Sequence, residues 1–336
     1  MPSATMDVGN RKGAETTVHV FLWGIGVLAV IVVALAGGMV LQYRRYRQSA
    51  PRPPYKQPAR RVRVADLPED GLTVCWIGHS TLFIRWNGLG ILTDPVFSER
   101  VGLHLGPVAV GPRRHTAPAM TLADVAPHVD LILLSHAHMD HFDMPTLRAL
   151  ANARIEVITA AGTSRLLRHL RFRRVRELHG EASVTTECGI RVTAVPVRHW
   201  GARYPWNKRY GWTGYLLEHA GQRLFFAGDT AHVPSFTHLR AHGAIDVVCM
   251  PIGAYAPASF QSAHCTPEQA WQMFVDTGGT FLVPMHWDTF VLSQEPVDEP
   301  LRRLLAAAGE QVDKVVVRAH GDVFTVQPSY VPVPTT

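Results

Sequence analysis

The sequence His136-Ala137-His138-Met139-Asp140-His141 directly follows the apolar stretch Asp-Leu-Ile-Leu-Leu-Ser at 130–135. Alternate residues of a strand project to one face, so the side chains of His136 and His138 can point together. The turn that follows can bring Asp140 and His141 toward a second metal ion. Imidazole nitrogens and carboxylate oxygens at this spacing are typical metal ligands. The hexamer therefore predicts a site for two metal ions at the end of a buried strand.

Further ligands are expected at the ends of other apolar strands, where a rigid scaffold fixes their geometry. Three such residues end apolar runs: His199 ends Pro-Val-Arg-His, Asp229 ends Phe-Phe-Ala-Gly-Asp and His286 ends Phe-Leu-Val-Pro-Met-His. The simplest assignment is His136, His138 and His199 for one metal, Asp140, His141 and His286 for the other, and Asp229 as a bridge between them. Ligands without thiolates suit two zinc ions best, and iron or manganese also fit.

The remaining pattern predicts an α/β protein. Short β-rich runs separated by turn residues alternate with amphipathic stretches, and Asn87-Gly88 is a hairpin signal. Two β-rich halves with helices outside predict a sandwich of four layers. The expected strands are 72–77, 81–86, 90–93, 131–134, 155–158, 191–195, 213–218, 223–227, 245–250, 281–284, 314–318 and 323–326. The expected helices are 144–150, 164–169, 267–275 and 299–308.

The N-terminal region predicts a membrane anchor. Residues 18–41 contain no Asp, Glu, Lys or Arg and are long enough to cross a bilayer. The alternative is a signal peptide cleaved after Ala34-Leu35-Ala36, but the apolar run exceeds the usual length of such a segment. The expected division is a tail at 1–17, a transmembrane helix at 18–41, a basic Pro-rich linker at 42–65, a globular domain at 66–328 and a tail at 329–336.

The distribution of charge argues against a nucleic-acid partner and gives an orientation in the membrane. The linker holds eight Lys and Arg residues and no acidic residue, so the positive-inside rule places the body in the cytoplasm. From residue 66 onward, 23 Lys and Arg stand against 25 Asp and Glu, a net charge of −2. A polyanion would not be attracted to this body as a whole. The four cysteines form no dense pattern that would indicate a disulfide framework.

Several motifs give the chain a resemblance to the metallo-β-lactamase superfamily, and within it to the N-acyl-phosphatidylethanolamine-hydrolysing phospholipase D group. The resemblance covers residues 72–325. Besides the hexamer, it rests on Trp-Ile-Gly-His-Ser-Thr at 76–81, Leu-Thr-Asp-Pro at 92–95, Arg-His-Trp at 198–200, Ala-Gly-Asp-Thr at 227–230, Pro-Ile-Gly-Ala-Tyr at 251–255 and Met-His-Trp-Asp-Thr-Phe at 285–290. It implies an αββα fold, two zinc ions and hydrolysis of a phosphodiester in a membrane phospholipid.

Hydrolysis of a phosphodiester also requires a proton for the leaving alkoxide. Asp94, His264 or a bound water are candidates for this role. By resemblance His264 has the stronger claim, because it precedes Thr-Pro-Glu at a loop that enters a helix. Asp140 is assigned a catalytic role in addition to metal binding.

Aromatic residues crowd the loop after His199, and large aromatic side chains usually pack in a core. We expect core packing for this set, with an acyl groove as the alternative: Trp200, Tyr204, Trp206, Tyr210 and Trp212. The main rival activity is hydrolysis of a soluble phosphodiester, cyclic phosphate or lactone, because one site of this kind serves many substrates. A membrane-tethered scaffold without catalysis is a further alternative. The oligomeric state is open between a monomer and a homodimer.

Overall fold

The computed structural model describes residues 8–326 except 106, 107, 205 and 208. The chain divides into two compact units, Met1–Ala50 and Pro51–Thr336. The first contains the helix α1 (Val8–Ser49), so residues 8–17, expected in a tail, are helical. None of the helices formed by the described residues combines the length and apolar character that crossing a membrane requires. The predicted span at 18–41 stays a prediction, and the tail at 329–336 lies outside the described residues.

The second unit contains two large sheets and a small hairpin. The first sheet has the strand order β15-β1-β2-β3-β6-β7-β8, and the second has the order β14-β13-β12-β11-β10-β9. The strands are β1 (Leu72–Gly78), β2 (Thr81–Trp86), β3 (Leu89–Thr93), β4 (Leu103–Leu105), β5 (Val108–Val110), β6 (Leu131–Leu134), β7 (Glu156–Ala160), β8 (Arg174–Leu178), β9 (Ser183–Thr185), β10 (Arg191–Val195), β11 (Gly214–His219), β12 (Gln222–Phe226), β13 (Val247–Pro251), β14 (Phe281–Met285) and β15 (Val323–Val326).

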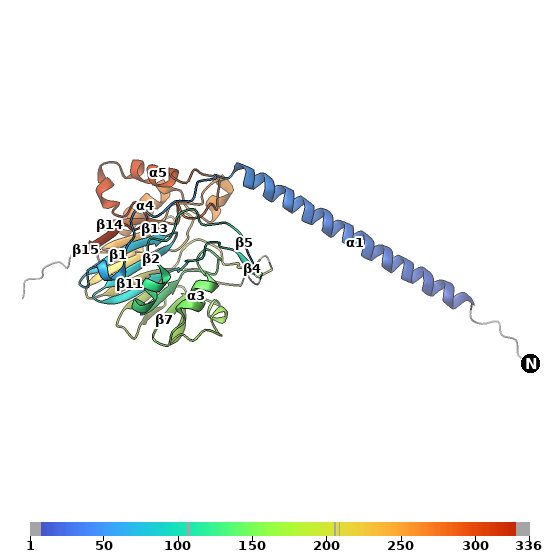
Figure 1. The fold of residues 1–336 in the computed structure, drawn as a ribbon, viewed down its shortest axis with the longest axis horizontal. Coiled ribbons are helices and arrows are strands. Elements are labelled where there is room, and N and C mark those ends of the chain that lie inside the picture. The colour runs from blue at the N-terminus through green and yellow to red at the C-terminus, as the bar shows by residue number, and fades with distance from the viewer. Residues whose placement is uncertain (1–7, 106–107, 205, 208, 327–336) are drawn as a thin grey trace, which may run out of the picture. The chain divides into compact units, whose positions relative to one another are not determined.

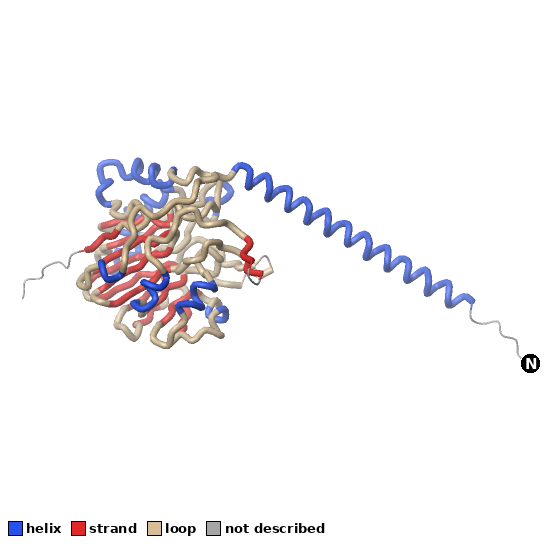
Figure 2. Tube along the Cα trace, viewed as in Figure 1, coloured by secondary structure: helices blue, strands red, loops and turns tan. Residues whose placement is uncertain are grey.

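Helices cover the outer faces of the two large sheets, as Figures 1 and 2 show for α3 on one side and α4 and α5 on the other. The α-helices of the body are α2 (Leu122–Val125), α3 (Met144–Leu150), α4 (Pro267–Thr277) and α5 (Glu299–Ala308). Short 3-10 helices are η1 (Val64–Asp66), η2 (Ala126–His128), η3 (Ser164–Leu166), η4 (Thr237–His242), η5 (Ala258–Ser262) and η6 (Gly309–Lys314). The order helix, sheet, sheet, helix is the predicted four-layer αββα sandwich.

Alternating side chains explain why the first sheet can be buried on both faces. In β6, Leu131 and Leu133 belong to the core between the two sheets, whereas Ile132 and Leu134 pack in the core beneath α2 and α3. Successive side chains of a strand point to opposite faces, so a continuous apolar run fills two cores. The same alternation places Trp76 of β1 between the sheets.

The topology gathers the ends of seven strands at one edge of the sandwich. In the first sheet β3 and β6 are parallel, and β1 runs in their direction because β2 is antiparallel to both of its neighbours. In the second sheet β12, β13 and β14 are parallel, and β10 shares their direction through the antiparallel β11. The residues that follow these strands can therefore converge, although they come from distant parts of the sequence.

Some local predictions differ from the structure. The helix expected at 164–169 is only the short η3, since the Thr163 hydroxyl donates to the carbonyl of Ala160 and does not cap the segment. The strand expected at 314–318 is replaced by the end of η6 and a single bridge between Val315 and Leu282. The Asn87-Gly88 hairpin is confirmed, because both residues have positive φ, at 48° and 83°.

The segment 51–65, expected as part of a basic, extended linker, lies against the body. Lys56 pairs through its backbone with His115 and Ala117, and its ammonium group is 2.7 Å from the Asp288 carboxylate. The Val62 N–H donates to the carbonyl of Ala119. A Pro-rich, basic composition indicates an extended backbone, and here that backbone finds hydrogen-bond partners in the loop 115–119.

The two-sided core leads to a stability prediction. Leu133→Ala should lower the free energy of unfolding by about 2–5 kcal/mol, because it leaves a cavity between the sheets. Val275→Ala is the control, since Val275 is 40% exposed and surface changes stay within about 0.5 kcal/mol. Urea unfolding of both variants checks this. A similar, small effect of the two changes would contradict the assignment of Leu133 to the core.

Candidate metal centre

A first group of ring nitrogens lies where the loop after β6 meets the loop after β10. Nε2 of His136 is 2.8 Å from Nδ1 of His138, and that Nδ1 is 3.2 Å from Nε2 of His199. All three side chains are largely buried. Three imidazole nitrogens that converge in this way match the three protein ligands of a zinc site with one position left open.

A second group of donors lies beside the first. The carboxylate of Asp140 has its Oδ2 atom 3.6 Å from Nε2 of His141 and 3.6 Å from Nε2 of His286. His79 belongs to the same group, with Nε2 3.0 Å from Asp140 Oδ2. The sequence interpretation did not assign a role to His79. It follows the buried strand β1, which is the signal that singled out the other strand-end ligands.

Asp229 lies between the two groups, at the position expected of a bridge. Its Oδ2 atom is 3.1 Å from Nε2 of both His141 and His286 in the second group. The same oxygen is 3.9 Å from Nε2 of both His136 and His199 in the first group. The structure thus brings together every residue assigned to the two metals, and metal binding itself stays a prediction.

The site's unpaired donors fit metal ions. Among the described residues, Nε2 of His141, Nε2 of His286 and Oδ1 of Asp229 are buried without a hydrogen bond. A buried polar atom without a partner costs about 1–3 kcal/mol, so several such atoms pointing inward call for a ligand. Imidazole and carboxylate donors suit zinc, iron or manganese. The residues present therefore fit two such ions.

Most ligand histidines are held by a second hydrogen bond. Nδ1–H of His141 donates to Asp94 Oδ2 at 2.7 Å, and Nδ1–H of His199 donates to the carbonyl of Ala263 at 2.8 Å. Nδ1–H of His136 donates to Oγ of Ser135 at 2.8 Å. These bonds fix the tautomer and turn Nε2 toward the other candidate ligands.

Asp94 and His264, the two proposed proton donors, occupy different places. Asp94 is fully buried behind His141 and also accepts from the backbone and hydroxyl of Ser135. This geometry favours a positioning role for Asp94, and its role as a proton donor stays a prediction. His264 is at the centre itself, with Nδ1 3.8 Å from Asp229 Oδ2.

The charges at the site are strongly coupled. Burial alone would raise the pKa of Asp229, but His141 and His286 hold it well below its usual range. Burial would lower the pKa of His286, yet Asp229 and Asp140 raise it to about 9. For His264, burial outweighs the attraction of Asp229 and lowers the pKa to about 3. The metal-free centre therefore keeps a proton on His286 and leaves His264 neutral near pH 7.

The aromatic residues after His199 are only partly in the core. Tyr210 is buried as expected, but Trp200, Trp206 and Trp212 are 50%, 80% and 40% exposed, so the core prediction is wrong for these three. The centroid of the Trp200 ring lies 4.3 Å from the centroid of the His138 ring. The loop carries these side chains on the surface beside a predicted metal ligand.

Metal binding should strengthen as the pH rises from about 6 to about 9, because the proton of His286 competes with the metal for Nε2. The raised pKa of His286 keeps this proton bound over that range in the metal-free protein. Calorimetric titration with zinc in buffers of different ionisation enthalpy measures the protons released. Binding near neutral pH without proton release would contradict the protonated state of His286.

Asp94→Asn should weaken the binding of one metal by about 10- to 100-fold, because His141 loses the carboxylate that orients it. Competition with a chromophoric chelator measures this affinity. The matched control is Asp143→Asn, since Asp143 is equally buried but accepts from the hydroxyls of Ser98 and Thr146. An equal loss in both variants would trace the effect to general loss of packing.

Comparison with known proteins identifies the family. Residues 90–287 match the model of the beta-lactamase superfamily domain. An uncharacterised protein of Mycobacterium tuberculosis is 35% identical over 82% of this chain and 74% of its own length. An N-acyl-phosphatidylethanolamine-hydrolyzing phospholipase D of Caenorhabditis elegans is 29% identical over 73% of each protein.

A solved structure shares the fold. The metallo hydrolase of the archaeon Ignicoccus hospitalis superposes with a TM-score of 0.56 at 19% identity, over 77% of this chain and 100% of that one. The family match and the shared architecture show that the chain belongs to the beta-lactamase superfamily and has the fold of its metal-dependent hydrolases.

Proposed function

We propose that the protein is a metal-dependent phosphodiesterase of the phospholipase D type, acting on N-acyl-phosphatidylethanolamine or a related phospholipid. The observation that carries the proposal is the position of Asp229 Oδ2. This oxygen lies 3.1 Å from Nε2 of His141 and His286, and 3.9 Å from Nε2 of His136 and His199. A carboxylate between two sets of nitrogen donors is the arrangement expected of a two-metal hydrolase.

The first group (His136, His138, His199) would hold one ion. The second (Asp140, His141, His286), which His79 borders, would hold the other. When bound, two such ions supply an activated water and neutralise the charge on phosphoryl oxygens. The chain's own residues supply the geometry: Asp94 orients His141, and the carbonyl of Ala263 orients His199. Zinc is the proposed metal, because the donor set contains histidine and carboxylate ligands.

His264 is the proposed proton-transfer residue. In phosphodiester hydrolysis, water oxygen forms a bond to phosphorus, the bond from phosphorus to the alcohol oxygen breaks, and the alcohol gains a proton. The centroid of the His264 ring lies 5.1 Å from that of the His199 ring and 5.4 Å from that of the His286 ring. His264 therefore borders both donor groups. A neutral imidazole can accept a proton from water and pass it to the leaving oxygen.

A lipid substrate is supported by the exposed indoles beside the centre. Trp200 packs against His138, and Trp212 forms a backbone bridge with His136. Both indoles are partly exposed. Indole rings combine an apolar body with a polar N–H group and are enriched at the interface between membrane and water. They could contact the acyl part of a phospholipid whose headgroup reaches the metals.

Membrane anchoring through residues 18–41 is part of the same proposal. The support is the absence of charged residues from that stretch and the exposure of large apolar side chains such as Phe21, Leu22 and Trp23 in α1. Large apolar side chains that stay exposed to water are unfavourable. The eight basic residues that follow favour a cytoplasmic body. Such an anchor would keep the enzyme near a lipid substrate.

The purified full-length protein should hydrolyse N-acyl-phosphatidylethanolamine in mixed micelles and contain two metals per chain. His138→Ala and Asp229→Asn should each reduce turnover by more than about 100-fold, because each removes a ligand of the two-metal site. His169→Ala is the matched control, since His169 is exposed and belongs to neither donor group. Liquid chromatography with mass detection measures the products, and elemental analysis measures the metal in each preparation.

Three outcomes would change the proposal. Two bound metals with hydrolysis of bis(p-nitrophenyl) phosphate but of no phospholipid would favour a soluble phosphodiester substrate. Two bound metals without activity toward either substrate would leave a lactone or another ester. Failure to bind metal at all would contradict the proposed centre and favour a tethered scaffold.

A further inference from the structure

The ligand histidines differ in how their second ring nitrogen is held. His136, His141 and His199 each donate from Nδ1–H to a hydroxyl, a carboxylate and a carbonyl, respectively. Among the described residues, two candidate ligands have a buried second nitrogen without a hydrogen-bond partner, Nε2 of His138 and Nδ1 of His286. Histidines that bind metals almost always donate this second N–H group to a carboxylate, a carbonyl or a water. His286 therefore lacks an expected contact.

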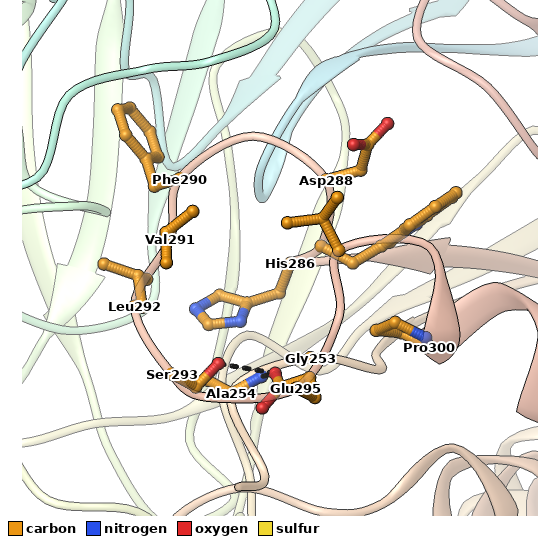
Figure 3. A pocket seen from close by; sticks show the side chains of 12 residues that line it. Gly253, Ala254, His286, Asp288, Phe290, Val291, Leu292, Ser293, Glu295 and Pro300 are labelled. Atoms are coloured by element: carbon orange, nitrogen blue, oxygen red, sulfur yellow. Dashed lines mark hydrogen bonds between the residues drawn. The ribbon is translucent and has the colours of Figure 1, made fainter. Parts of the chain in front are cut away.

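A small pocket lies on that side of His286. Its volume is about 20 Å³, and its lining includes Ala254, His286, Ser293 and Glu295. Figure 3 shows one ring nitrogen of His286 turned toward Ser293 and Ala254. This nitrogen is Nδ1, because Nε2 is the atom that faces Asp229 at 3.1 Å. A polar pocket needs about 10–15 Å³ to hold one water molecule, so one water fits here.

Glu295 offers the acceptor that such a water needs. Its side chain is buried, and Oε1 accepts from the Ala254 N–H at 2.6 Å and from the Ser293 hydroxyl at 2.5 Å. Among the described residues, Oε2 accepts only from the Ala256 N–H, at 3.0 Å. A carboxylate has about four acceptor positions. One position on Oε2 is therefore left for a hydrogen bond from water.

We propose that Glu295 is a positioning residue for the metal ligand His286 and acts through one water molecule in this pocket. The water accepts from Nδ1–H of His286 and donates to the carboxylate of Glu295. Nε2 then stays unprotonated and directed at the metal. Glu295 does through water what Asp94 does directly for His141, and both carboxylates serve the donor group of Asp140, His141 and His286.

The inference deepens the proposed function and rests on its metal centre, but it does not depend on the substrate. Glu295 also ties the loop 252–257 to the loop that follows His286, through the N–H groups of Ala254 and Ala256. Loss of Glu295 could therefore act through packing alone. The test must separate the effect on metal binding from an effect on the fold.

The first test compares the zinc and cobalt affinities of Glu295→Gln with those of the wild-type chain by chelator competition. The side-chain amide keeps the size of Glu295 but loses the charge, and it presents N–H where the water needs an acceptor. We expect the affinity for one of the two metals to fall about 10- to 100-fold and the other to be unchanged. Cobalt absorption bands should change for the same site only.

Ser293→Ala is the matched control. It removes a neighbouring hydrogen bond to Oε1 but leaves Oε2 free to accept from the water, so both affinities should stay as in the wild type. Equal affinities in Glu295→Gln and the wild type would overturn the inference while leaving the proposed function intact. An equal loss in Ser293→Ala would also overturn it, because the cause would then be loop packing. A wild-type chain that binds no metal would instead contradict the proposed function.

A second measurement decides the question if Glu295→Gln does not fold. A high-resolution crystal structure of the metal-loaded wild-type protein should show a water within hydrogen-bond distance of His286 Nδ1 and a Glu295 carboxylate oxygen. A direct contact of Nδ1 with a protein atom, or a pocket without water, would overturn the inference.

Discussion

The candidate centre depends on one carboxylate oxygen, Oδ2 of Asp229, held between two sets of imidazole nitrogens. A buried carboxylate is costly without partners of opposite charge or hydrogen-bond donors. In the metal-free protein the partners are His141 and His286, each 3.1 Å away. In the proposed metal-bound state, cations held by the two donor groups would balance this charge instead. The site can thus form without metal, because protonated His141 and His286 balance part of the negative charge that metal ions would balance.

The sandwich brings the loops that carry these side chains to one edge. His79, Asp94 and the hexamer follow strands of the first sheet, whereas His199, Asp229 and His286 follow strands of the second. The large apolar core between the sheets fixes the separation of these loops. Trp76 connects this core to the candidate centre directly, since its indole is fully buried and its N–H donates to the carbonyl of His79. Packing between the sheets therefore sets the distances at the centre.

Local patterns were sufficient to predict much of this arrangement. The hexamer and the polar residues after apolar strands marked the residues that the structure brings together, and alternating runs marked most strands. His79 was missed although it directly follows the buried strand β1, the same signal that marked the other strand-end ligands. The positioning role of Asp94 could not be predicted, since it depends on a contact between residues 47 positions apart. The exposed indoles were misassigned because residue type alone does not say which aromatic side chains reach the surface.

The docked segment before β1 affects where the chain could be shortened. A protein cut at residue 66, the boundary that composition suggests, would lose the pairing of Lys56 with the loop 115–119 and its ion pair with Asp288. It would also lose Val64, which packs beneath the first sheet. Asp288 lies two residues after the candidate ligand His286, so the loss of contacts would fall close to the predicted metal centre. A crystallisable fragment that keeps the catalytic body whole should therefore begin no later than Pro51, where that compact unit starts.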